Sequence, residues 1–224
     1  FPPLIANPSE RIFFNGINEL IFLTKLSYKA YLNYYTDFVC KASILYNAAD
    51  SKLFFKLDSK QKEKQKHLMG FKSKLIFIWC SQDRPKKGLN LILQVWKKIV
   101  DKQGIEAELL IIGTERKNDY PRVNFIGRIS NNQLAKYYQI SDFYLFPTLC
   151  KEGFGMVLVE ALKCGCYCIA SNQGGVPEVL QFGTLGCIVE NPNFEDEWME
   201  AIEEGIEIYR QNNYNNPYNK FIGD

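Results

Sequence analysis

The sequence has little of what several enzyme classes require. Its only histidine, His67, lies in a run of lysine and glutamine, which argues against a Ser-His-Asp or Cys-His mechanism housed in this chain. No Gly-x-Gly-x-x-Gly follows an expected strand, so a redox dinucleotide-binding protein is disfavoured. None of the seven cysteines forms a Cys-x-x-Cys pair. We expect Cys164, Cys166 and Cys168 to be small buried side chains rather than a metal cluster.

Strong charge and long apolar runs are also missing. The formal net charge of +2 is too small to imply a nucleic-acid partner. No apolar run approaches the roughly 18 residues that span a bilayer. The first residues have neither an initiating Met nor a basic region, so we expect no signal peptide and a chain cut from a longer protein. The run of mixed charge at 59–67 predicts a solvated linker or a surface helix.

Apolar runs and helical patterns alternate from residue 74 onward. Continuous apolar strands that alternate with helices predict an α/β fold, a Rossmann-like parallel sheet with helices on both faces. The expected strands are 74–80, 107–113, 123–127, 142–147, 166–171 and 186–190, and the expected helices are 88–100, 130–140, 153–165, 176–180 and 195–210.

The chain divides into three expected parts. Residues 1–60 are interpreted as an interdomain segment with a strand, a helix and a strand, in part the remnant of a preceding domain. Residues 61–210 form the Rossmann-like domain. Residues 211–224 are rich in Asn and Tyr and are expected to fray.

Glycine and charged residues collect in the loops that follow the strands, where such sheets bind ligands. After the first strand of the domain, Arg84, Lys86 and Lys87 stand before Gly88, and cations in this position suit a diphosphate. Simple surface solubility is the other reading of these side chains. The loops 113–119 and 127–132 would present glycine and backbone groups beside a base or a ribose.

Two acids frame the helix expected at 153–165. Glu160 stands among apolar residues, where a carboxylate without a partner costs several kcal/mol. Glu152, eight positions earlier, would lie roughly 12 Å away along a helix, too far to share a proton but suited to one elongated ligand. Gly153 and Gly155 would let backbone N–H groups approach that ligand. Nucleotide-sugars, with hydroxyls at both ends and phosphates between, match this layout. A salt bridge or backbone cap at Glu160, and a simple helix-start acid at Glu152, remain open.

The segment from Glu152 to Glu160, "EGFGMVLVE", has seven residues between two glutamates. It is preceded by "FPT" and followed by "ALKCGCYCIASNQGGVPE". Together with "KKGLNLILQVW" and "VNFIGRISNNQLAKYYQISDFYLFPT", it closely resembles the signature of the retaining group 1 glycosyltransferases (glycosyltransferase family 4), in the C-terminal, donor-binding half of the GT-B fold. The resemblance covers most of residues 19–208.

The resemblance implies roles for the sugar end of the site. Glu152 would contact the hydroxyls of the donor sugar. Phe154 and Gly155 would offer backbone amides to the sugar or the diphosphate, and Glu160 would accept the ribose hydroxyls.

It also implies roles at the phosphate and base end. Lys87 would hold the diphosphate, with Arg84 as the candidate replacement for an arginine that the family places where this chain has Gln82. The base would lie against Gly127, Arg128 and Ile129, close to Gly113. The interdomain Asn-Gly-x-Asp turn of the family departs here at Ala48.

The function implied is that of a donor-binding domain. The whole enzyme would transfer a sugar from a nucleoside diphosphate sugar, UDP- or GDP-linked, to an acceptor hydroxyl, without a metal or other cofactor. Its partners would be the donor and an N-terminal acceptor domain absent from this chain, without which the chain is expected to be inactive. We expect a cytoplasmic protein, and peripheral association with the inner membrane face stays open. The alternatives are a nucleotide-sugar epimerase of the same fold and a non-catalytic nucleotide-sugar-binding module.

Overall fold

A computed structural model describes residues 16–35, 40–72, 74–103, 105–116 and 119–212. All strands in this part of the chain run parallel, in a two-stranded sheet of order β1-β2 and a six-stranded sheet of order β5-β4-β3-β6-β7-β8. The strands are β1 (Glu19–Phe22), β2 (Lys41–Ile44), β3 (Leu75–Cys80), β4 (Ala107–Ile112), β5 (Val123–Gly127), β6 (Phe143–Phe146), β7 (Tyr167–Ser171) and β8 (Gly186–Val189).

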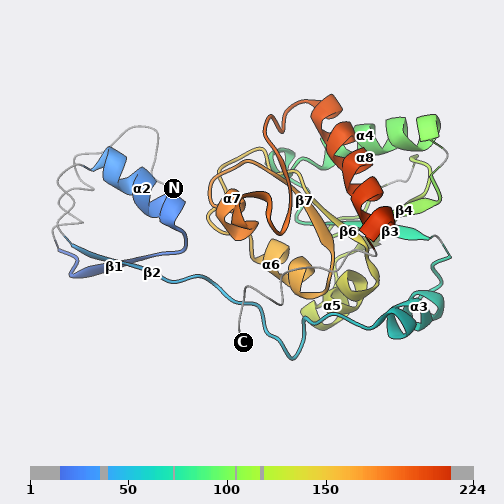
Figure 1. The fold of residues 1–224 in the computed structure, drawn as a ribbon, viewed down its shortest axis with the longest axis horizontal. Helices are drawn as coiled ribbons and strands as arrows, with labels where there is room; N and C mark the ends of the chain where they lie inside the picture. Colours follow the sequence, from blue (N-terminus) through green and yellow to red (C-terminus); the bar gives the residue numbers. More distant parts are fainter. Residues whose placement is uncertain (1–15, 36–39, 73, 104, 117–118, 213–224) are drawn as a thin grey trace.

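The helices connect these strands (Figure 1). They are α2 (Lys25–Tyr34), α3 (Ser59–Leu68), α4 (Leu89–Gln103), α5 (Asn131–Ile140), α6 (Met156–Lys163), α7 (Val176–Val179) and α8 (Glu195–Asn212), with short 3-10 turns η1 (Pro85–Lys87) and η2 (Gln181–Gly183). Helix α8 ends inside the predicted tail, and residues 213–224 lie outside the described residues, as do residues 1–15. No helix in the described part is both long and apolar enough to cross a membrane.

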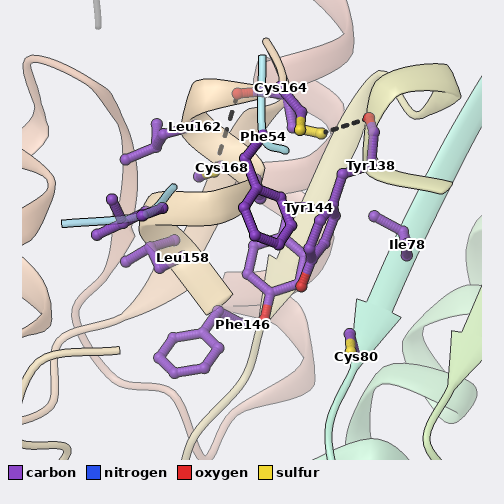
Figure 2. Close-up of a cluster of buried hydrophobic side chains, with 14 of the residues drawn as sticks. Phe54, Ile78, Cys80, Tyr138, Tyr144, Phe146, Leu158, Leu162, Cys164 and Cys168 are labelled. Atoms are coloured by element: carbon purple, nitrogen blue, oxygen red, sulfur yellow. Dashed lines mark hydrogen bonds between the residues drawn. The ribbon is translucent and has the colours of Figure 1, made fainter. Parts of the chain in front are cut away.

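The six-stranded sheet is covered on both faces. Alternate side chains of β3 point to opposite sides, so that Phe77 packs with α4 and α8 while Ile78 packs with α5 and α6. Every residue of β3 is buried, which explains its uninterrupted apolar sequence. Figure 2 shows the core on the α6 side, where the Tyr138 and Tyr144 rings lie between side chains of α6 and those of β3. The predicted Rossmann-like sheet with helices on both faces is confirmed.

The order of the strands reverses beside β3. The chain moves outward through β4 and β5 and then returns to place β6 on the other side of β3. Loops after β3 and β6 therefore diverge from adjacent strands, and the crevice at such a switch point is where these sheets bind ligands.

The mixed-charge run expected to be a linker or a surface helix forms α3. Its start carries a capping box, in which Asp58 accepts from the Gln61 N–H and the Gln61 side chain accepts from the Asp58 N–H. One side of α3 is not solvated, however. Lys66 is buried and donates to the Lys74 carbonyl at 3.0 Å, and Lys62 forms an ion pair at 2.6 Å with buried Asp142.

Strands β1 and β2 and helix α2 stand apart from the six-stranded sheet in Figure 1, and an extended segment after β2 joins them to it. Helix α2 begins after Thr24, whose hydroxyl accepts from the Ser27 N–H. Aromatic rings pack together in this unit, where the ring centroid of Phe22 lies 5.2 Å from those of both Tyr28 and Tyr31.

Candidate functional site

The loop after β3 is fixed by a close approach to the end of β6. Gly88 has a φ of +70°, and a Cβ at this position would lie 2.0 Å from the Pro147 carbonyl oxygen. Only glycine combines this backbone conformation with this contact. The Leu149 N–H also donates to the Lys86 carbonyl at 2.8 Å. These contacts place Lys87 beside the loop between β6 and α6.

Lys87 and Glu152, which the sequence assigns to one ligand, lie side by side. Lys87 Nζ is 2.7 Å from Glu152 Oε2, and the two side chains remain 22% and 23% exposed. The ion pair is therefore accessible from solvent at the carboxyl edge of the sheet. An incoming anion with a hydroxyl beside it could replace each partner of the pair with a group of its own.

The glycines around Glu152 serve different purposes. Gly155 precedes α6 with a φ of +87°, a left-handed conformation that favours glycine. Gly153 has no other atom within 4 Å of where a Cβ would stand, so this side of its backbone is open, although its carbonyl oxygen lies against Gly175. Phe154, between them, is buried. A ligand can thus approach the backbone of Gly153 and the first N–H groups of α6.

Glu160 is the fifth residue of α6 and is half-buried. Burial raises its pKa to about 7. Within the part of the chain that the structure describes, its carboxylate has no hydrogen bond and no ion pair. None of these residues is a lysine that forms a salt bridge with Glu160, which was the alternative interpretation. The ribose role of Glu160 stays a prediction.

A second group of predicted residues lines a separate hollow at the ends of β3, β4 and β5. The cavity has a volume of about 530 Å³, and Arg84, Gly113 and Arg128 are among its lining residues. Gly127 contacts the lining residue Gly113, because its carbonyl accepts from the Gly113 N–H at 2.8 Å. Ile129 instead packs against the core on the α6 side. Among the predicted residues, the structure thus brings together Lys87 with Glu152, and Arg84 with Gly113 and Arg128.

The sequence analysis did not single out Arg116, which belongs to the loop after β4. It forms a two-pronged ion pair with Asp83, with both N–O distances at 2.5 Å, and donates to Asn90 at 2.7 Å. Its charge is therefore neutralised. Arg84 and Arg128 are exposed and form no ion pair with any described residue, which leaves both available to an anion.

Comparison with known proteins identifies relatives of this chain. The sequence model described as Glycosyl transferases group 1 matches residues 59–220. The N-acetyl-alpha-D-glucosaminyl L-malate synthase of Bacillus anthracis is 33% identical over 157 residues, covering 65% of this chain and 39% of that protein. A GDP-mannose-dependent phosphatidylinositol monomannoside mannosyltransferase of Corynebacterium glutamicum is 26% identical over 165 residues, covering 66% and 43%.

Solved structures share the fold. A glycosyltransferase from Rickettsia africae superposes with a TM-score of 0.75 at 18% identity, over 92% of this chain and 59% of that one. Anabaena HepE in complex with UDP gives 0.73 at 19% identity, over 89% and 57%. The chain spans less than half of these curated relatives and somewhat more than half of these structures. The fold is the Rossmann-like half of a GT-B glycosyltransferase, and the chain belongs to the group 1 glycosyl transferase family.

Proposed function

We propose that this chain is the donor-binding part of a retaining glycosyltransferase, which transfers a sugar from a nucleoside diphosphate sugar to an acceptor hydroxyl. The observation that carries the proposal is a solvent-accessible Lys87–Glu152 pair, followed eight positions later by a half-buried Glu160 that lacks a partner among the described residues. All three lie on loops or helices that leave the strands at the switch point of the sheet. A carboxylate is a poor neighbour for phosphate but a good acceptor for sugar hydroxyls, so the two acids fit the two ends of such a donor.

The chemistry would depend on charge that develops on the leaving diphosphate. The bond between the anomeric carbon and the phosphate oxygen would break, and a bond to the acceptor oxygen would form on the same face of the sugar. The departing phosphate oxygen would keep the electron pair of the broken bond and take the proton of the acceptor hydroxyl. Lys87, Arg84 and the free N–H groups at the start of α6 would stabilise the departing oxygen. Glu152 would orient the sugar through its hydroxyls. In this proposal no metal ion takes part.

The nucleotide base would lie at the arginine-lined hollow, beside Gly113, Gly127 and Arg128. Both UDP and GDP are candidates, since Anabaena HepE is solved with UDP and the Corynebacterium relative is named as GDP-mannose-dependent. The acceptor would bind to a domain outside this chain, and the enzyme would work in the cytoplasm. The relatives and neighbours are named as transferases and synthases, which favours transfer over epimerisation or mere binding.

Calorimetric titration tests the proposal. UDP, GDP, ADP and inorganic pyrophosphate are titrated into the wild-type chain and into Glu160→Ala, Lys87→Met and the control Glu200→Gln, which alters an exposed carboxylate on α8. Glu160→Ala should weaken the nucleoside diphosphates but not pyrophosphate, which has no ribose. Lys87→Met should weaken all of them by about 10- to 100-fold, the value of a hydrogen bond to a charged group. If no nucleoside diphosphate binds at millimolar concentration, the donor-site assignment is wrong.

A further inference from the structure

The amino end of α2 is held by a carboxylate from a distant part of the chain. Glu178, on α7, accepts from the backbone N–H groups of Lys25 at 2.8 Å and Leu26 at 2.9 Å. The Thr24 hydroxyl accepts from the next one, that of Ser27, at 3.1 Å. The first three N–H groups of the helix, which have no partner within it, are therefore all bonded. Helix α2 has no acid in its own first turn, so Glu178 supplies the negative charge that the helix dipole favours.

The same carboxylate reaches a second segment. Tyr46, in the extended segment after β2, donates its hydroxyl to Glu178 Oε1 at 2.6 Å. This hydrogen bond is the main reason that the pKa of Tyr46 is raised to about 12. The Tyr46 ring in turn lies 6.3 Å from the ring of Phe154, between centroids. Through the ring of Tyr46, Glu178 is thus connected to Phe154, in the loop that carries Glu152.

The start of α7 is joined to that loop through the backbone. The Gly175 N–H donates to the Glu152 carbonyl at 2.8 Å, and Gly174 forms a parallel β-bridge with Glu152. A Cβ on Gly175 would lie 2.3 Å from the Gly153 carbonyl oxygen and 2.8 Å from Thr24 Cγ2. Three segments therefore meet here without room for a methyl group. Side chains from all three line a cavity of about 670 Å³ beside the junction.

We propose that Glu178 is a positioning residue, which fixes the Glu152–Phe154 loop relative to α2 and Tyr46 and so sets the geometry in which the sugar of the donor is bound. The sugar as the ligand of this loop rests on the proposed function. Glu178 acts through its neighbours, because its oxygens are occupied by two backbone N–H groups and a phenol. Its influence should be felt mainly at the sugar end, because Lys87 pairs with Glu152 but has its backbone fixed by the contact of Gly88 with Pro147 in the loop after β3.

Amide hydrogen exchange measures the coupling directly. Glu178→Gln keeps the size of the side chain but leaves one acceptor oxygen in place of two. The Lys25, Leu26 and Gly175 amides should exchange at least tenfold faster in this variant, and the control Glu200→Gln should leave all three unchanged. If Lys25 and Leu26 respond while Gly175 keeps its protection, Glu178 is only a helix cap and the coupling is refuted.

Binding measurements separate positioning from general damage. UDP-glucose or GDP-glucose, according to the base that binds in the titration above, should lose at least fivefold in affinity on Glu178→Gln. Pyrophosphate should stay within twofold. Equal losses for both ligands, or no loss for either, overturn the positioning role.

A second variant keeps the test decisive if Glu178→Gln fails to fold. Tyr46→Phe leaves both helix hydrogen bonds intact and should cause a smaller loss that is again confined to the sugar conjugate; an unchanged affinity overturns the proposal. If the wild type binds neither nucleotide nor pyrophosphate, the proposed function fails, and the exchange rates of Tyr46→Phe and Glu178→Gln still decide the coupling.

Discussion

Replacing Glu160 by glutamine should make the fold more stable and nucleotide binding weaker, and both effects should depend on pH. Glu160 is half-buried in α6 and has no hydrogen bond or ion pair within the described residues. Burial raises its pKa from an ordinary 4.5 to about 7. In the unfolded chain the same carboxyl titrates at its ordinary value. The folded state therefore disfavours the ionised form.

The size of the effect follows from this difference. A shift from 4.5 to about 7 corresponds to about 3 kcal/mol, since each pKa unit is worth roughly 1.4 kcal/mol. Solvent at the exposed part of the side chain reduces this to about 2 kcal/mol. The contribution of Glu160 to the stability of the wild type is most favourable at low pH, where its carboxyl is neutral in both states. It falls as the pH rises from 4.5 to about 7, because the unfolded chain ionises first.

Glu160→Gln removes this loss. Its free energy of unfolding should exceed that of the wild type by about 2 kcal/mol at pH 8 and by only a few tenths at pH 4. Urea denaturation followed by circular dichroism at pH 4, 6 and 8 measures the difference, with Glu200→Gln as the control. An excess stability that is the same at pH 4 and pH 8 would refute the reasoning. So would a Gln variant that is less stable at pH 8, because Glu160 would then be satisfied inside the protein.

The affinity for UDP or GDP should change in the opposite sense. At pH 8 the wild-type carboxylate is ionised and can accept two hydroxyls, so the Gln variant should bind at least tenfold more weakly, as expected for a charged acceptor. At pH 5 the wild-type carboxyl is neutral and the gap should close. Calorimetric titration at the two pH values checks this, and a gap that stays constant would contradict an ionisable acceptor at this position.

Two further predictions concern the scaffold of the site. Asp142→Ala should lower the free energy of unfolding by about 3–5 kcal/mol, because it leaves the buried Lys66 and its neighbour Lys62 without their common partner; a loss under 1 kcal/mol in urea denaturation would show that this network contributes little. Gly88→Ala should cost about 3 kcal/mol, since its Cβ would meet the backbone of Pro147, directly after β6, whereas Gly153→Ala should leave the unfolding free energy unchanged; similar costs for both in thermal denaturation would contradict the close approach at Gly88.

The fold could be predicted because a strand that is buried on both faces of a sheet has an uninterrupted apolar sequence. Between Leu75 and Cys80 every residue is apolar, and the structure sends alternate side chains into two cores. The charged run that became α3 was harder to interpret. Lys62 and Lys66 are one helical turn apart and face Asp142, about 80 positions later. A local charge pattern indicates a solvated surface unless the distant counter-ion is known.

The sequence could single out candidate site residues, whose roles stay predictions, but it could not show how they are arranged. The Lys87–Glu152 ion pair joins positions 65 apart, and it depends on how Gly88 packs against the end of β6. Glu178 is a clearer example of a contact that the sequence alone does not show. Its position in the first turn of α7 explains it locally as a helix-start acid. Its carboxylate instead caps α2, 153 positions earlier, which no short-range pattern contains.

Two acids of this domain, Asp142 and Glu160, have opposite surroundings at the two edges of the sheet. Asp142 precedes β6 at the amino edge, where it accepts from the Ile76 N–H at 2.8 Å and from Lys62 and Tyr209 at 2.6 Å each. It is fully compensated and links β3, α3 and α8. Glu160 follows the same strand at the carboxyl edge, and the described residues offer it nothing comparable. An uncompensated carboxylate lowers stability, and such a cost is characteristic of functional sites, where a ligand can offset it. The contrast between the edges therefore supports the proposed donor site at the carboxyl edge on grounds other than sequence resemblance.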